Sequence, residues 1–129
     1  MKPPLLMKLS GAGFLLTGIL YWLPVWLVLR MIIQALSRAS QPAHFFAIAL
    51  LATALIFFAA LAAGHAAVAV GLLRGKTWAV LGALPFSLLD VATGVKASTL
   101  AFGWTYLILC GLVFAGLVAL ARGGARRRA

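Results

Sequence analysis

The sequence predicts an all-α membrane protein, with four transmembrane helices in an antiparallel up-down bundle. Hydrophobic residues make up 65% of the 129 residues and charged residues only 9%, whereas charged residues are about 25% of a soluble domain. A chain of this length cannot hide so much apolar surface from water, so a lipid bilayer must be its solvent. The apolar runs are continuous rather than alternating, which favours helices, because helices satisfy their own backbone groups in lipid.

The predicted elements form one transmembrane domain, residues 1–129. Each apolar run has about 18 residues or more, enough to cross a hydrocarbon core of about 30 Å. The second run exceeds a span, so its helix should tilt or project. Lys2 and Lys8 precede the first run, but that run is too long for a signal peptide and should be a retained anchor. The expected helices are 9–36, 44–73, 77–96 and 99–121, followed by a basic cytoplasmic tail at 122–129.

Short connections separate the predicted helices, so neighbouring helices should pack antiparallel. Gly75 is expected to take the positive φ that ends the second helix. Ser98 and Thr99 are candidate N-caps for the fourth helix. Pro24 and Pro85 lie inside the first and third helices, where each removes a backbone hydrogen bond and can kink the axis.

The basic residues predict the orientation. With a cytoplasmic N-terminus, three basic residues lie outside and eight inside. Positive residues concentrate on the cytoplasmic side, so both termini should be cytoplasmic, in a multi-pass protein of the bacterial inner (plasma) membrane. The outer residues are Arg30, Arg38 and Lys96; the inner ones are Lys2, Lys8, Arg74, Lys76, Arg122, Arg126, Arg127 and Arg128.

The net charge of +10 does not indicate a nucleic-acid-binding protein. Most basic residues stand singly or in pairs between apolar runs, and no recognition module is present. The expected partners are the lipid bilayer, anionic lipid headgroups at the basic tail, and a second copy or a larger membrane protein.

Small residues spaced four apart predict faces where helices pack closely, since membrane helices associate through small side chains. An alanine- and glycine-rich sequence also produces such spacings by chance. The candidates are Ala59, Ala63, Ala67 and Gly71 in the second helix, Gly111, Ala115 and Ala119 in the fourth, and Ala79, Ala83 and Ser87 in the third.

Asp90 is the only acidic residue, and it lies inside the third apolar run, 14 residues beyond Lys76. An ionisable group at membrane depth is costly and marks a candidate functional site. A structural pairing with Arg30, or a hydrogen bond to Thr93, is one interpretation. The others are a working carboxylate for proton coupling or cation binding, and pairing with a partner subunit.

His65 is a second polar group at depth, almost opposite the predicted alanine face of the second helix. Helical rise places His65 and Asp90 about 8 Å apart in depth, which predicts no direct bond and leaves a water-linked relay open. A hydrogen-bonded structural histidine is the alternative. Cys110 is the only cysteine and is interpreted as a small packing residue.

No enzymatic activity is predicted. The sequence has no second carboxylate for acid–base catalysis, no metal-ligand spacing and no phosphate-binding loop. We therefore expect no catalytic residues, no bound metal and no cofactor. We expect a small accessory, structural or assembly subunit. The alternative is a small transporter or channel subunit that uses Asp90 as a proton- or cation-coupling group.

The junction Gly71-Leu72-Leu73-Arg74-Gly75-Lys76-Thr77-Trp78-Ala79 resembles one found in small, uncharacterised bacterial four-helix membrane proteins. This resemblance implies a fold and a membrane, and no activity. In size and helix count the chain is also similar to the small multidrug resistance exporters. Those exporters carry their essential carboxylate as a glutamate in the first helix, whereas here Asp90 lies in the third.

Overall fold

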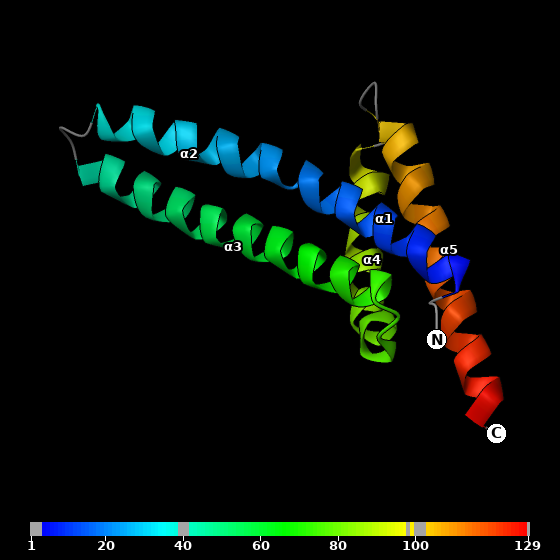
Figure 1. Cartoon of the computed structure of the whole chain (residues 1–129). Coiled ribbons are helices and arrows are strands. Elements are labelled where there is room, and N and C mark those ends of the chain that lie inside the picture. Colours follow the sequence, from blue (N-terminus) through cyan, green and yellow to red (C-terminus); the bar gives the residue numbers. More distant parts are fainter. Residues whose placement is uncertain (1–3, 39–41, 98, 100–102, 129) are drawn as a thin grey trace. The chain divides into compact units, whose positions relative to one another are not determined.

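Helices account for nearly all of the described chain. The structure is a computed structural model that describes residues 4–38, 42–97, 99 and 103–128, of which 42, 43, 97 and 125–128 by backbone alone. Four helical spans are long and apolar enough to cross a membrane, which confirms the all-α class. The elements are α1 (Leu5–Leu20), α2 (Trp22–Leu36), α3 (Pro42–Leu73), α4 (Thr77–Ala97) and α5 (Gly103–Arg128) (Figure 1).

The predicted first helix is divided at Tyr21 into α1 and α2, which together form one span, Leu5–Leu36. Pro24 causes the break, because it has no N–H to donate to the carbonyl four residues earlier. The neighbouring bonds survive: the Tyr21 N–H donates to the Thr17 carbonyl at 3.1 Å, and the Val25 N–H to the Tyr21 carbonyl at 3.4 Å. Tyr21 also keeps helical backbone angles, so the chain continues as a helix beyond it.

The turn between α3 and α4 forms as predicted. Gly75 has a φ of 73°, a conformation that a side chain would strain. Its N–H donates to the Leu72 carbonyl at 3.0 Å, and the Lys76 N–H donates to the Gly71 carbonyl at 2.9 Å. These two bonds form a Schellman motif, which satisfies carbonyls left open at a helix end. The turn therefore sends the chain directly from α3 into α4.

The last helix differs from its predicted bounds. It is described from Gly103 onward, and Thr99, one of the two candidate caps, lies in a turn; residues 100–102, where the predicted helix would begin, lie outside the described residues. Ser98, the other candidate cap, lies outside the described residues. At its C-terminal end α5 continues to Arg128, because arginine and alanine are good helix formers. The predicted tail is thus largely an extension of the helix.

The chain divides into two compact units. Unit 1 comprises residues 1–16 and 65–129, and unit 2 comprises residues 17–64. The main hydrophobic core lies in unit 1, where α1, α3, α4 and α5 each contribute to it. Its buried members are Met7, Phe14, Val68, Ala69, Leu72, Ala79, Val80, Ala83 and Leu117.

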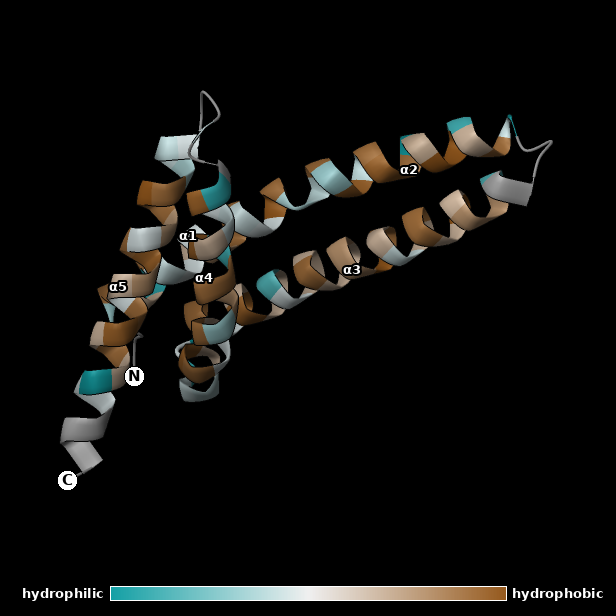
Figure 2. Cartoon of the chain, turned by 180° about the vertical axis from the view of Figure 1, so that it is seen from behind, coloured by the Kyte–Doolittle hydropathy of each residue, from teal (hydrophilic) through white to brown (hydrophobic). Residues whose placement is uncertain are grey.

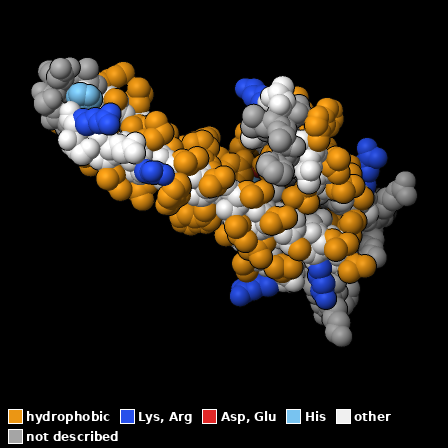
Figure 3. All heavy atoms as spheres, turned by 90° about the horizontal axis from the view of Figure 1, so that it is seen from above, with side chains coloured by type: hydrophobic (Ala, Val, Ile, Leu, Met, Phe, Trp, Pro, Cys, Tyr) orange, Lys and Arg blue, Asp and Glu red, His pale blue; other side chains and the backbone are white. Residues whose placement is uncertain are grey.

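Apolar side chains also cover the outside of the helices. Large hydrophobic residues are exposed on every helix, and hydropathy colouring shows apolar positions around the helices (Figure 2). Hydrophobic side chains dominate the face seen in Figure 3, with lysines and arginines scattered among them. Soluble monomers rarely expose so much contiguous apolar surface, whereas a bilayer would solvate it.

The predicted packing face of α4 is buried within the chain, whereas those of α3 and α5 are mostly not. Ala79, Ala83 and Ser87 are buried, and Gly71 of α3 packs against Ala79. Of the remaining predicted residues, Ala63, Ala67, Ala115 and Ala119 are exposed, and Ala59 and Gly111 are half-buried.

The rotation of the helices explains this difference between α4 and the other two helices. In unit 1, α3 buries the face that carries His65, Val68 and Leu72, because a polar side chain at membrane depth needs protein partners. Turning His65 inward places the almost opposite alanine face outward. In α5 the inward face carries Cys110 and Leu117. A spacing of four residues identifies a stripe but not the direction in which it faces.

Two glycines of the predicted packing faces should respond differently to alanine. A Cβ on Gly71 would lie 2.7 Å from the Ala79 Cβ, whereas one on Gly111 would meet no atom of the described residues within 4 Å. We expect Gly71→Ala to lower the free energy of unfolding by about 1–3 kcal/mol. Gly111→Ala, the matched control, should leave it unchanged or raise it by up to about 1 kcal/mol. Circular dichroism during denaturation in detergent micelles measures the free energy of unfolding of both variants. An equal decrease in the two would contradict the close contact of Gly71 with Ala79.

Candidate functional site: a buried histidine–aspartate pair

Asp90 and His65 form a direct hydrogen bond within unit 1. The Nε2 atom of His65 on α3 lies 2.9 Å from Oδ2 of Asp90 on α4. His65 is fully buried and Asp90 is 3% exposed. The pair uses the only acidic side chain of the protein. The prediction that their different depths prevent a direct bond was therefore wrong.

The direction of the two side chains explains the error. Helices α3 and α4 contact each other in reversed order, with Gly71 against Ala79 and Val68 facing Gly82. This register places His65 level with Phe86, one turn before Asp90. Side chains on a helix lean toward its N-terminus. Because the contacts of α3 and α4 run in reversed order, the side chains of His65 and Asp90 lean toward each other. Together they bridge the rise of one helical turn, which the sequence-based estimate counted as a gap between them.

Two phenylalanines enclose the imidazole. The Phe14 ring of α1 stacks on it with centroids 5.3 Å apart and an interplanar angle of 28°. The Phe86 ring of α4 meets it edge-on, with centroids 5.0 Å apart and an angle of 70°. Sequence analysis missed both residues. Phe86 could have been found from its position one turn before Asp90, but no local signal connects Phe14 to the pair.

The pair can share one proton in two arrangements. If the carboxylate is ionised, the His65 Nε2–H donates to it; if Asp90 is protonated, its O–H donates to the imidazole nitrogen. Each arrangement satisfies a polar group that would be costly to bury alone. The bond therefore makes two ionisable groups compatible with an apolar interior.

Further polar side chains lie on the neighbouring helix faces. Cys110 of α5 is buried, shares a side-chain hydrogen bond with Tyr106, and lies within electrostatic reach of Asp90. Ser87 precedes Asp90 by three residues, so the two share a face of α4. The buried Ser87 hydroxyl has no hydrogen-bond partner among the described residues. The sequence-based interpretation of Cys110 as packing alone did not include its proximity to Asp90.

The other predicted site residues are placed differently. Thr93 is exposed, and its hydroxyl donates to the Leu89 carbonyl at 2.9 Å. Arg30 belongs to unit 2, where its guanidinium carbon lies 5.6 Å from the Trp26 ring centroid; its pairing with Asp90 stays a prediction. Within the described residues, no group of three or more His, Cys, Asp or Glu side chains could hold a metal ion.

A double-mutant cycle tests whether the pair stabilises unit 1. Asp90→Leu and His65→Leu should each lower the free energy of unfolding by about 1–3 kcal/mol, because each leaves one buried polar group without its partner. The double variant should cost less than the sum of the two, since it removes both polar groups. The measurement is equilibrium denaturation in mild micelles.

Thr93→Val serves as the control on the same helix. Its exposed side chain should change stability by no more than about 0.5 kcal/mol. If the losses in unfolding free energy for Asp90→Leu and His65→Leu are strictly additive in the double variant, the hydrogen bond between the two residues does not stabilise the fold.

No protein-family model, curated protein or solved structure matches this chain. The resemblance of residues 71–79 to a junction in small four-helix membrane proteins therefore stays a prediction.

Proposed function

We propose that this protein is a small, non-enzymatic subunit of the bacterial inner membrane, with an accessory, structural or assembly role. One observation carries the proposal: the only acidic side chain is hydrogen-bonded to His65 and enclosed in unit 1. A carboxylate that couples transport must exchange protons or ions with water. A carboxylate with 3% exposure, paired with an imidazole between two phenylalanines, is better suited to holding α3 and α4 together.

The proposed topology is an antiparallel up-down bundle with both termini in the cytoplasm. The reversed order of contacts between α3 and α4 supports it, as do the contacts of α1 with α5, where Gly13 meets Val113 and Gly116 meets Ser10. The eight-to-three distribution of basic residues supports the orientation.

The proposed partner is a second copy of the chain or a larger membrane protein. Small residues on α3 and α5 face outward, notably Ala63 and Ala67 on α3 and Ala115 and Ala119 on α5. In lipid, small side chains let another helix approach closely. These two outward faces are the places where a partner helix would pack.

A second candidate function is proton-coupled transport, and one arrangement of side chains favours it. Asp90 bonds His65, and Cys110, which shares a side-chain hydrogen bond with Tyr106, lies within electrostatic reach of Asp90. These groups come from α3, α4 and α5, and each can carry a proton. Rows of ionisable residues within membranes often form proton relays.

Membrane topology can be tested with single cysteines at the two ends of α4. In a Cys110→Ala background, Lys96→Cys should react with a membrane-impermeant maleimide added to intact cells. Lys76→Cys, the matched control at the other end, should react only after permeabilisation. The reverse pattern would contradict the proposed orientation, and equal labelling of both would contradict a spanning α4.

The subunit proposal predicts that the protein migrates as an assembly in mild detergent. Native mass spectrometry should detect a defined complex with a second copy or a larger protein. Ala115→Phe should disrupt this complex by blocking the outward face of α5. Leu81→Phe, an exposed position on α4, should leave it intact. A wild-type protein that migrates only as a monomer would contradict the proposal.

Proton flux separates the two candidate functions. Vesicles containing the protein and a pH-sensitive dye should dissipate an imposed pH gradient no faster than empty vesicles. A faster decay that Asp90→Asn abolishes, while insertion is retained, would instead support the transport candidate.

A further inference from the structure

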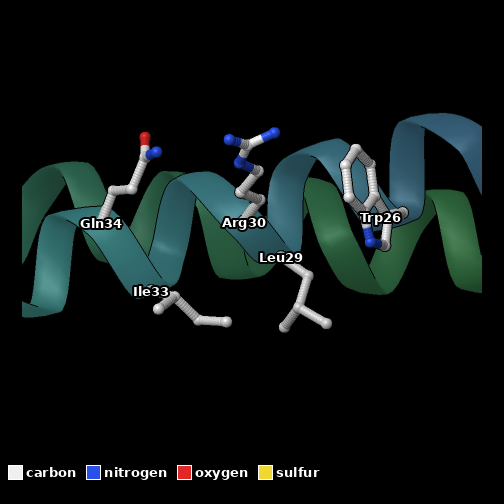
Figure 4. A pocket seen from close by; sticks show the side chains of 5 residues that line it. All are labelled: Trp26, Leu29, Arg30, Ile33 and Gln34. Carbon is white, nitrogen blue, oxygen red and sulfur yellow. The ribbon is translucent and has the colours of Figure 1, made fainter.

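The α2 helix of unit 2 carries polar and apolar side chains side by side around a shallow hollow. The hollow has a volume of about 330 Å³ and is lined by Trp26, Leu29, Arg30, Ile33 and Gln34. Figure 4 shows Arg30 and Gln34 pointing to one side of the helix, beside Trp26, and Leu29 and Ile33 pointing to the other. The wall of the hollow itself is almost entirely apolar, and the polar ends of Arg30 and Gln34 lie to one side of it (Figure 4).

The charge inventory favours an external anion as the partner of Arg30 at this hollow. Lysines and arginines number eleven, against a single acidic side chain, and that side chain is buried against His65. Arg30 lies over the Trp26 ring at 5.6 Å, an arrangement that attracts a cation to an aromatic face but does not neutralise it. No second carboxylate exists in this sequence for Arg30.

The position of Arg30 along the sequence indicates what supplies that anion. Arg30 lies six residues before the end of the candidate membrane span Leu5–Leu36, which favours a place near one membrane surface, where lipid phosphates lie. Tryptophan is also enriched at that level.

We propose that this hollow on α2 binds an anionic phospholipid. The guanidinium of Arg30 bonds the lipid phosphate through charge-assisted hydrogen bonds. The Gln34 amide donates to the phosphate or to an ester oxygen. The acyl chain lies against Leu29 and Ile33, and Trp26 occupies the boundary between headgroup and chain. The proposal rests on the proposed membrane placement but not on the accessory role, and it concerns α2 rather than the basic C-terminal tail.

Quenching of Trp26 by brominated lipids tests the site. Replacing Trp22, Trp78 and Trp104 with phenylalanine leaves Trp26 as the only tryptophan. This protein is reconstituted with mixtures of brominated phosphatidylglycerol or brominated phosphatidylcholine. We expect Trp26 to prefer phosphatidylglycerol about fivefold, the effect of one basic residue near an anionic surface.

Three variants identify the residue responsible. Arg30→Gln should abolish the preference, and Arg30→Lys should retain most of it by keeping the charge. Arg38→Gln, the matched control, removes the same charge eight residues further on and should leave the preference unchanged. Because each ratio compares two lipids on one protein, altered Trp26 fluorescence in a variant does not affect it.

Several outcomes would overturn the proposal. One is equal quenching of Trp26 by both lipids in the protein that retains Arg30, and another is a preference for phosphatidylglycerol that survives Arg30→Gln. Either result would show that the hollow does not select an anionic headgroup. Loss of the preference in 10 mM inorganic phosphate, at constant ionic strength, would assign the site to a free anion. A second variant keeps Trp104 as its only tryptophan. If neither lipid quenches Trp26 in the first variant or Trp104 in the second, the membrane placement itself would be contradicted.

Discussion

The need of one buried carboxylate for a partner governs the arrangement of unit 1. Asp90 and His65 come from different helices, and their 2.9 Å bond fixes the rotation of α3 and α4 about their axes. Once His65 faces inward, Val68 and Leu72 face inward with it, because they share its side of α3. The alanines on the other side then point outward. One polar contact thus selects which of several apolar faces becomes the core.

Close backbone packing makes that contact achievable. Gly71 lies against Ala79 at the start of the α3–α4 pair, and Gly75 closes the turn between the helices with a positive φ. These residues bring the two axes near each other and set their register. Asp90 and His65 then need only lean toward their own helix N-termini to meet. The small residues allow the axes of α3 and α4 to approach closely, and the polar pair determines which face of each helix points inward.

The same bond shapes the electrostatics of the whole chain. It engages the only acidic side chain, so we expect the basic residues at the helix ends to find counterions outside the protein. Anionic lipids are the nearest source in a membrane. Inside unit 1, Phe14 and Phe86 pack on the His65 ring, and Cys110, which is hydrogen-bonded to Tyr106, lies within electrostatic reach of Asp90. The proposed structural role of the pair and the alternative role in proton transport differ in one respect, which is whether water reaches the Asp90 carboxylate.

Sequence alone determined the helical class, the four apolar spans, the glycine turn at Gly75 and the inward face of α4. These follow from composition, run length and local backbone rules, which do not depend on distant residues. The bond between His65 and Asp90, the stacking of Phe14 and the outward direction of the α3 alanines needed the tertiary structure. They depend on how far one helix is rotated and shifted against another. Periodicity within a single helix contains no information about that rotation, because it is set by the contacts of both helices together.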